Sequence, residues 1–317
     1  MAFKLDSELS EKQIEADIAT YFGWITPIGR QVPFRLLDID EQVSGADKKF
    51  NHVIPIYMQF KVSDGLTKLN NNRFPIQFPF PFHLTALKRI RTFRNRENLF
   101  DNPTLYFKLR AMAKTASDFQ HNILLKLANT GTSHAFYVSP LTLSKTAYEQ
   151  MLFSSTDRYR LFPYHIMDRV EIHQERWTSY FGFVPFLRGH VSIVPHEKVS
   201  THEHYYSFSP NGTDIAWHSP QLLTNSSSRL SDMLKYIFTT AFSDSKNWTT
   251  PRAFLSQLTD IKEFDFVRQY SDNDNDNYSV EQLVNFGREL YQKHNIRQLL
   301  LLTTREFLNE NDKYFNL

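Results

Sequence analysis

Two polar side chains stand in a stretch that is otherwise largely apolar, residues 55–63. Gln59 and Lys61 are two positions apart, so on a β-strand they point to the same face of the sheet. Met58, Phe60 and Val62 would point to the opposite face, and we expect them to enter the core. Placing an amide and an ammonium group on a core strand costs free energy unless they have partners or a task, so this pair directs attention to catalysis.

A carboxylate precedes this strand, because Asp47 ends a glycine-containing turn. Phosphodiester hydrolysis is assisted by a divalent cation, which neutralises phosphoryl oxygens and lowers the pKa of the attacking water. Mg²⁺ (or Mn²⁺) takes hard oxygen ligands, so Asp47, the side-chain oxygen of Gln59 and the backbone carbonyl of Phe60 form a candidate metal site. Lys61 could orient or deprotonate the water and stabilise the developing charge.

A further carboxylate has two candidates, Glu15 and Glu41. Glu15 lies on a helix expected over residues 7–22, at the border of its apolar face, and could reach the metal directly or through water. Glu41 precedes Asp47 by six residues and could take the same role. The sequence does not rank the two.

The order of expected elements gives these residues a context. After the helix over 7–22 come strands over 32–39 and 55–63, a helix over 116–127 and a strand over 133–139. This order, with Glu15, Asp47 and Gln59-x-Lys61 in it, resembles the PD-(D/E)xK nuclease superfamily. The similarity is greatest to the branch with glutamine in place of the second acid, as in Mrr-type restriction endonucleases and nucleases of anti-phage systems.

The resemblance covers residues 1–145 and implies several expectations. The fold class would be α/β (α+β mixed), with a restriction-endonuclease-like core whose central mixed sheet is flanked by helices. The activity would be Mg²⁺-dependent hydrolysis of DNA, with Asp47, Gln59 and Glu15 at the metal, in prokaryotic anti-phage defence or restriction. Gln59 departs from the usual acid, which lowers the negative charge of the site and weakens its affinity for metal.

Residues 64–102 read as an insertion between the strand of Lys61 and the next core helix. The insertion contains a proline- and phenylalanine-rich segment, residues 74–82, and then a basic helix. We expect this helix to bind substrate phosphates, with polar help from the helix over 116–127. The candidate substrate-binding residues are Lys88, Arg89, Arg91, Arg94, Gln120 and His121. The alternative is a solvated helix beside an aromatic packing strip.

Composition limits the other possibilities. The chain has 317 residues, of which 41% are hydrophobic, and a net charge of +2, so its total charge does not indicate nucleic-acid binding. It has no cysteine, which excludes disulfides and thiolate chemistry. No apolar run reaches the roughly 18 residues of a membrane span, and no signal peptide is recognisable, so we expect a soluble cytoplasmic protein.

Residues 146–317 are expected to form an α+β region that recognises substrate, forms a homo-oligomer or senses a trigger through a partner protein. A non-catalytic alternative remains for the whole chain, namely a regulatory module on a nuclease-like scaffold that holds nucleic acid or protein. The two hypotheses differ in whether the carboxylates and Lys61 converge around room for a cation.

Overall fold

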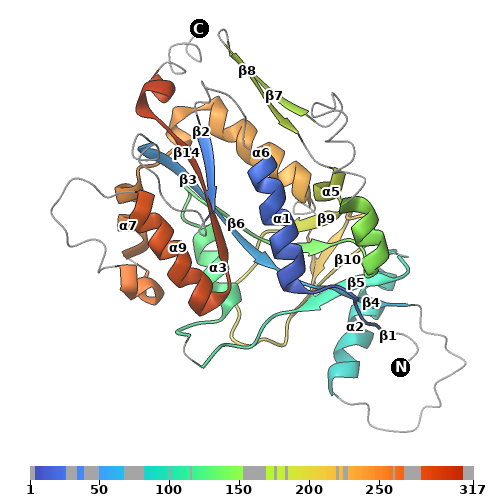
Figure 1. The fold of residues 1–317 in the computed structure, drawn as a ribbon. Coiled ribbons are helices and arrows are strands. Elements are labelled where there is room, and N and C mark those ends of the chain that lie inside the picture. Colours follow the sequence, from blue (N-terminus) through green and yellow to red (C-terminus); the bar gives the residue numbers. More distant parts are fainter. Residues whose placement is uncertain are drawn as a thin grey trace, which may run out of the picture.

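A computed structural model describes most of the chain. The described residues are 4–25, 34–38, 50–67, 82–99, 101–114, 116–152, 169–174, 177–182, 185–218, 221–223, 228–259, 261–267 and 280–309. Within them the chain forms two six-stranded sheets with helices around them and a separate hairpin that projects from this body (Figure 1). None of the described helices is long and apolar enough to cross a membrane.

One of the two six-stranded sheets is mixed and lies at the centre of the fold, with the strand order β13-β9-β6-β3-β14-β2. β3 and β6 run parallel, as expected for strands joined through a helical crossover, and the other neighbours are antiparallel. The strands of this central sheet are β2 (Phe34–Asp38), β3 (His52–Phe60), β6 (His134–Pro140), β9 (His190–Ile193), β13 (Ser228–Arg229) and β14 (Arg297–Thr303).

Helices cover both faces of the central sheet, because its strands carry apolar side chains on each side. One face packs against α3 (Gln120–Ala128), α7 (Pro251–Thr259) and α9 (Val280–His294), and Tyr57 and Leu300 belong to this core. The other packs against α1 (Glu11–Ile25), α5 (Pro185–Arg188) and α6 (Leu230–Ser243), and Met58 and Leu301 belong to that core. Residues 145–152 and 305–309 are also helical.

β3 begins three residues earlier than expected, so Pro55 lies inside it. The Lys61 N–H donates to the Val138 carbonyl, which shows that odd-numbered residues of β3 direct their backbone groups towards β6. Pairing with β6 starts only at Ile56. An N–H at position 55 would therefore point to a place where β6 does not pair with β3, so a proline there costs no hydrogen bond of the sheet. This explains how a proline is accommodated in a central strand.

A second, antiparallel sheet was not anticipated from the sequence. Its order is β1-β4-β5-β10-β11-β12, formed by β1 (Lys4–Leu5), β4 (Asp64–Leu66), β5 (Thr104–Lys108), β10 (Tyr205–Phe208), β11 (Ile215–Trp217) and β12 (Gln221–Leu222). Gly212 lies in the turn that joins β10 to β11 and has φ +66°, a conformation that glycine adopts without strain. α2 (Phe82–Arg96), from the expected insertion, packs its Leu87 and Ile90 against this sheet. The separate hairpin pairs β7 (Arg169–Gln174) with β8 (Trp177–Gly182).

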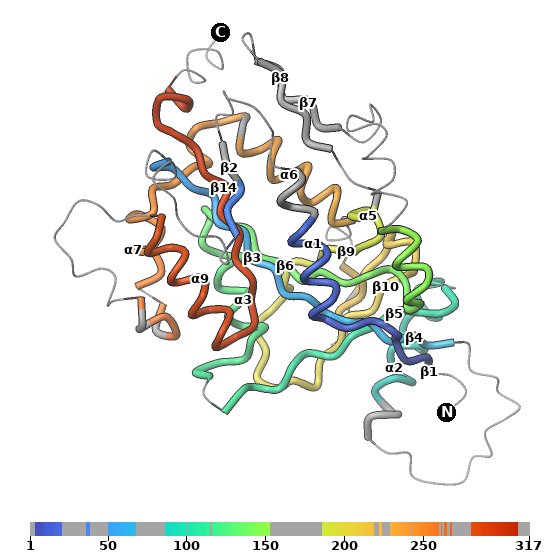
Figure 2. Tube along the Cα trace, viewed as in Figure 1, coloured from blue at the N-terminus to red at the C-terminus, as the bar shows by residue number. Residues whose placement is uncertain are grey.

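The expected division after residue 145 does not correspond to a boundary in the structure. β14 lies between β2 and β3, and β9 extends the same sheet beyond β6, so residues from both halves share one sheet (Figure 2). The fold class is confirmed as mixed α/β, with a central mixed sheet flanked by helices. A restriction-endonuclease-like core remains a prediction.

The position of β14 leads to a stability prediction. Leu301→Ala should lower the free energy of unfolding by about 2–5 kcal/mol, because Leu301 is fully buried between β14 and the helices beside it. Leu5→Ala, at a leucine that is 39% exposed, should change it by only about 0.5 kcal/mol. Urea unfolding of both variants measures the difference. Equal effects would contradict the central place of β14.

Candidate functional site

Lys61 lies at the carboxyl end of β3 and is buried. Gln59 is 0% exposed and Lys61 is 5% exposed, while Met58 and Phe60 enter the opposite core, as the alternation predicted. The Lys61 Nζ is 3.5 Å from Glu11 Oε1 of α1 and 3.4 Å from Gln120 Oε1 of α3. Both contacts are long, so the ammonium group is held between two helices without a close ion pair.

The surroundings of Lys61 disfavour its charged form. Burial lowers the pKa of Lys61, and the Glu11 carboxylate only partly opposes this. Arg110 adds a repulsive positive charge that lowers the pKa further. A buried lysine with a lowered pKa beside an opening is the type of group that exchanges protons in active sites.

The side-chain oxygen of Gln59 receives no hydrogen bond from the described residues. Its Nε2 donates to the Phe60 carbonyl at 3.1 Å, and this bond fixes which way the amide is turned. The Gln59 Oε1 is buried and has no hydrogen-bond partner in the part of the chain that the structure describes. A buried amide oxygen in this state lacks about 1–3 kcal/mol of compensation, which a cation, a water or a ligand donor could supply.

Glu15 is in place at this end of the sheet, but its oxygens are already bonded. The Arg297 Nη1 is 2.8 Å from Glu15 Oε1, and the Tyr291 hydroxyl donates to Glu15 Oε2 at 3.1 Å. Arg297 also donates two bonds to Asp38, at 3.0 and 2.8 Å. Burial would lower the pKa of Arg297, but the carboxylates of Asp38 and Glu15 outweigh it and raise that pKa. Glu15 is therefore one of two acids sharing an arginine.

The other predicted acids, Asp47 and Glu41, lie outside the described residues. β2 ends at Asp38 and runs in the same direction as β3, since both are antiparallel to β14. Their carboxyl ends therefore meet at one edge of the sheet, the edge that carries Lys61. Within the described residues no group of three or more acidic or histidine side chains could hold a metal ion.

Gln120 and His121 are neighbours in sequence but face different regions. Gln120 accepts from Lys61 and donates through Nε2 to the His294 carbonyl at the end of α9, so it does contact the predicted site. His121 does not, because its ring nitrogens contact the Tyr137 hydroxyl at 2.9 Å and the Glu197 carbonyl at 2.8 Å. The expectation that His121 binds substrate therefore fails: its ring is stacked in the core between the two sheets.

The basic helix α2 is divided between surface and interior. Lys88 and Arg89 are exposed, whereas Arg91 is 2% and Arg94 is 0% exposed. Arg91 donates to Thr104 and to the Asp101 carbonyl, and Arg94 bonds to Asp101, Asp214 and Ser207. The expectation that Arg91 and Arg94 contact substrate phosphates is not supported, because their donors fasten α2 to the second sheet. Lys88 and Arg89 remain candidates.

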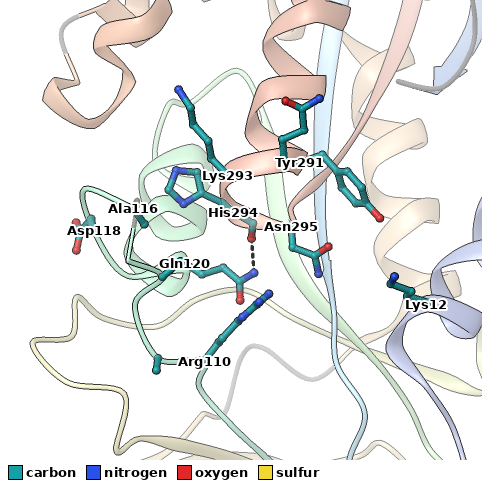
Figure 3. Close-up of a pocket in the computed structure, with 12 residues that line it drawn as sticks. Lys12, Arg110, Ala116, Asp118, Gln120, Tyr291, Lys293, His294 and Asn295 are labelled. Carbon is teal, nitrogen blue, oxygen red and sulfur yellow. Dashed lines mark hydrogen bonds between the residues drawn. The ribbon is translucent and has the colours of Figure 1, made fainter.

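A cavity of about 400 Å³ is lined on one side by Gln120 (Figure 3), and the Oε1 of this residue lies 3.4 Å from the Lys61 Nζ. Lys12 enters it from α1, Arg110 from the segment after β5, and Tyr291 and Asn295 from the end of α9. Three of its twelve lining residues are basic and one, Asp118, is acidic. The opening beside Lys61 is therefore suited to an anion.

No family model, no curated protein and no solved structure matches the chain. The site rests on its own geometry. Sequence reasoning missed Glu11, Asp38, Arg110 and Arg297. Glu11 could have been found, because it lies one helical turn before Glu15 and so shares its face. No local pattern marks Arg297, which reaches Glu15 from 282 residues away in the sequence.

The burial of Arg94 is testable by a matched pair of variants on one helix. Arg94→Met should lower the free energy of unfolding by about 3–5 kcal/mol, because it leaves the carboxylates of Asp101 and Asp214 without their arginine. Arg89→Met, at an exposed position of the same helix, should change it by about 0.5 kcal/mol or less. The measurement is chemical denaturation. If Arg94→Met left the free energy of unfolding unchanged, Arg94 would again be a candidate for contact with substrate phosphates.

The core position of His121 leads to a pH prediction. Burial lowers the pKa of His121 to about 4, from 6.5, so the folded state holds a neutral imidazole while the unfolded chain takes up a proton below pH 6.5. Stability is therefore lost as the pH falls from 6.5 towards 4, by up to about 1.4 kcal/mol per pH unit for this one group. His121→Phe should flatten the acid side of a stability profile measured by urea unfolding. An unchanged slope would contradict the neutral, core assignment.

Proposed function

We propose that this protein is a metal-dependent nuclease that hydrolyses phosphodiester bonds in DNA. The observation that carries the proposal is the end of β3. There a buried lysine lies beside an amide oxygen that has no donor among the described residues, within reach of Glu11 on α1 and next to Gln120, which lines a basic cavity. This combination suits a reaction in which a proton leaves water and negative charge develops on phosphate oxygens.

The residues have distinct roles in this proposal. Lys61 positions the attacking water and, as the neutral amine that its lowered pKa favours, accepts a proton from it, while Glu11 and Gln120 hold its Nζ in place. Lys88 and Arg89 are exposed on α2 and offer charge to the nucleic-acid backbone. The setting that we infer, cytoplasmic anti-phage defence or restriction with a second copy or a partner protein, rests on the resemblance alone.

The cation that this chemistry requires, Mg²⁺ or Mn²⁺, would supply charge neutralisation and a more acidic water. Gln59 fits as a neutral ligand, because its Oε1 is buried and lacks a donor among the described residues. Glu15 fits a water-mediated contact, because Arg297 and Tyr291 already occupy one lone pair on each of its oxygens. Asp47 is the carboxylate that we assign to the metal directly, on the sequence pattern.

One observation favours a second candidate function, a non-catalytic module that holds nucleic acid. Arg297 pairs with both Glu15 and Asp38 and offsets one of their two negative charges, which reduces the negative charge available to a divalent cation. A protein of this kind would bind DNA in the presence of a chelator and would not turn it over when metal is added.

A cleavage assay separates the two functions. The full chain is incubated with supercoiled and linear DNA in Mg²⁺, Mn²⁺ or EDTA, and the products are resolved on gels. We expect nicking or degradation only with metal. Lys61→Met and Asp47→Asn should each lower the rate by about 100-fold or more, since each removes a group that acts in the transition state.

The matched control is Lys235→Met, at an exposed lysine of α6 on the other side of the central sheet. It should retain full cleavage, and thermal unfolding should show that Lys61→Met is folded. Binding without turnover in any metal would establish the non-catalytic module. Cleavage retained in both Lys61→Met and Asp47→Asn would show that a different site is responsible.

A further inference from the structure

The cavity next to Gln120 is lined by basic side chains that have no role in the proposed cleavage reaction. Its walls come from the start of α1, residues 110–118 and the end of α9 (Figure 3). Gln120 forms the partition, because its Oε1 accepts from Lys61 while its Nε2 donates to the His294 carbonyl on the cavity wall. A group bound in the cavity would therefore lie next to the end of β3.

Two cations in the cavity are not neutralised. Lys12 and Arg110 are exposed, and among the described residues neither has an acidic side chain within ion-pair distance. The other charged groups of the lining are occupied. Asp118 pairs with Lys126 at 3.1 Å, a lysine that it shares with Glu263 at 2.5 Å, and Lys293 contacts Glu289 at 2.8 Å. Basic side chains therefore outnumber acidic ones in the lining by three to one.

The end of α9 would normally repel an anion, because its last carbonyls carry partial negative charge. Here that effect is reduced, since Gln120 caps the His294 carbonyl and the Asn295 N–H donates to the Tyr291 carbonyl at 2.7 Å. Asn295 has φ +53°, a left-handed conformation that asparagine tolerates at a helix end, and its side-chain amide reaches the cavity (Figure 3).

We infer that this cavity binds a phosphate monoester, either the 5′-phosphate at the end of a DNA strand or a free nucleoside monophosphate. Two cations beside an amide fit a dianionic terminal phosphate better than the single charge of an internal phosphodiester. A volume of about 400 Å³ is large enough for the phosphate and its nucleoside. The inference deepens the proposed function. It depends on that function only if the ligand is the end of a DNA strand, because a free nucleotide could bind whether or not the protein is a nuclease.

Binding without catalysis tests the inference. Two oligonucleotides of one sequence, with a 5′-phosphate or a 5′-hydroxyl and a 3′ fluorophore, are titrated with the full chain in EDTA. The 5′-phosphate should tighten binding by about tenfold, the effect of one or two charge-assisted hydrogen bonds. Adenosine 5′-monophosphate, adenosine and inorganic phosphate are used as competitors, and only the first and last should displace the phosphorylated strand.

Variants assign the effect to the cavity. Arg110→Gln and Lys12→Gln remove one charge each at exposed positions and should erase most of the tenfold preference while leaving the thermal unfolding temperature unchanged. Lys235→Gln, an equal loss of charge on α6, should preserve it. Arg110→Lys keeps the charge without the planar donors and should retain part of the preference.

The outcomes are separable from those of the cleavage assay, because EDTA removes turnover. A preference that is lost in Arg110→Gln supports the inference even if the chain cleaves nothing. A fluorescent derivative of adenosine 5′-monophosphate serves as a second probe. Its displacement by unlabelled adenosine 5′-monophosphate, without any effect of the strand end, also supports the inference and identifies the free nucleotide as the ligand. Equal binding of both strands with no displacement by the nucleotide overturns it. A preference unaffected by Arg110→Gln and Lys12→Gln overturns it as well.

Discussion

The pairing of β14 with both β2 and β3 is the constraint on which the rest of the structure depends. The seven residues of β14 lie between two strands that are more than 230 residues earlier in the sequence, so the central sheet cannot form without this long-range pairing. The same pairing brings Arg297 opposite Met58, two residues before the end of β3. From there its guanidinium group reaches Glu15 and Asp38. β14 therefore determines both the register of its two neighbouring strands and the position of the arginine that pairs with Glu15 and Asp38.

Charge balance at this edge of the sheet follows from that placement. Arg297 takes two carboxylates and has its pKa raised, because the attraction of both acids exceeds the effect of burial. Glu11 is then the one described carboxylate in ion-pair contact with Lys61, at a distance of 3.5 Å. The lysine is held in position but not neutralised by a close partner, and burial lowers its pKa. Without Arg297, Glu15 would be a buried carboxylate that keeps the hydrogen bond from Tyr291 and has lost its ion pair.

Features that arise from local periodicity could be predicted from the sequence. Strand pairing and side-chain burial that depend on residues far away in the sequence could not. Alternation placed Gln59 and Lys61 on one face of their strand, and the apolar pattern gave the strand over 133–139, which is observed as β6, to within one residue. The second sheet was missed because its strands are two to five residues long and β5 pairs with β10 about 100 residues later. On α2, Leu87 and Ile90 are buried together with Arg91 and Arg94. That burial depends on Asp101 and Asp214, and Asp214 is 120 residues from Arg94.

The glutamine at position 59 is consistent with this distribution of charge. A carboxylate there would lie on the same face as Lys61 and would pair with it, which would raise the pKa of the lysine and cancel part of the positive field that reaches the cavity. An amide keeps its oxygen available as a ligand and leaves Lys61, Lys12 and Arg110 as an excess of cationic groups. Mg²⁺ commonly binds through one or two carboxylates together with substrate phosphates. Under the proposed function, a site with few acids would therefore take up its cation chiefly with the nucleic acid already bound, so phosphate recognition by the basic cavity would precede metal binding.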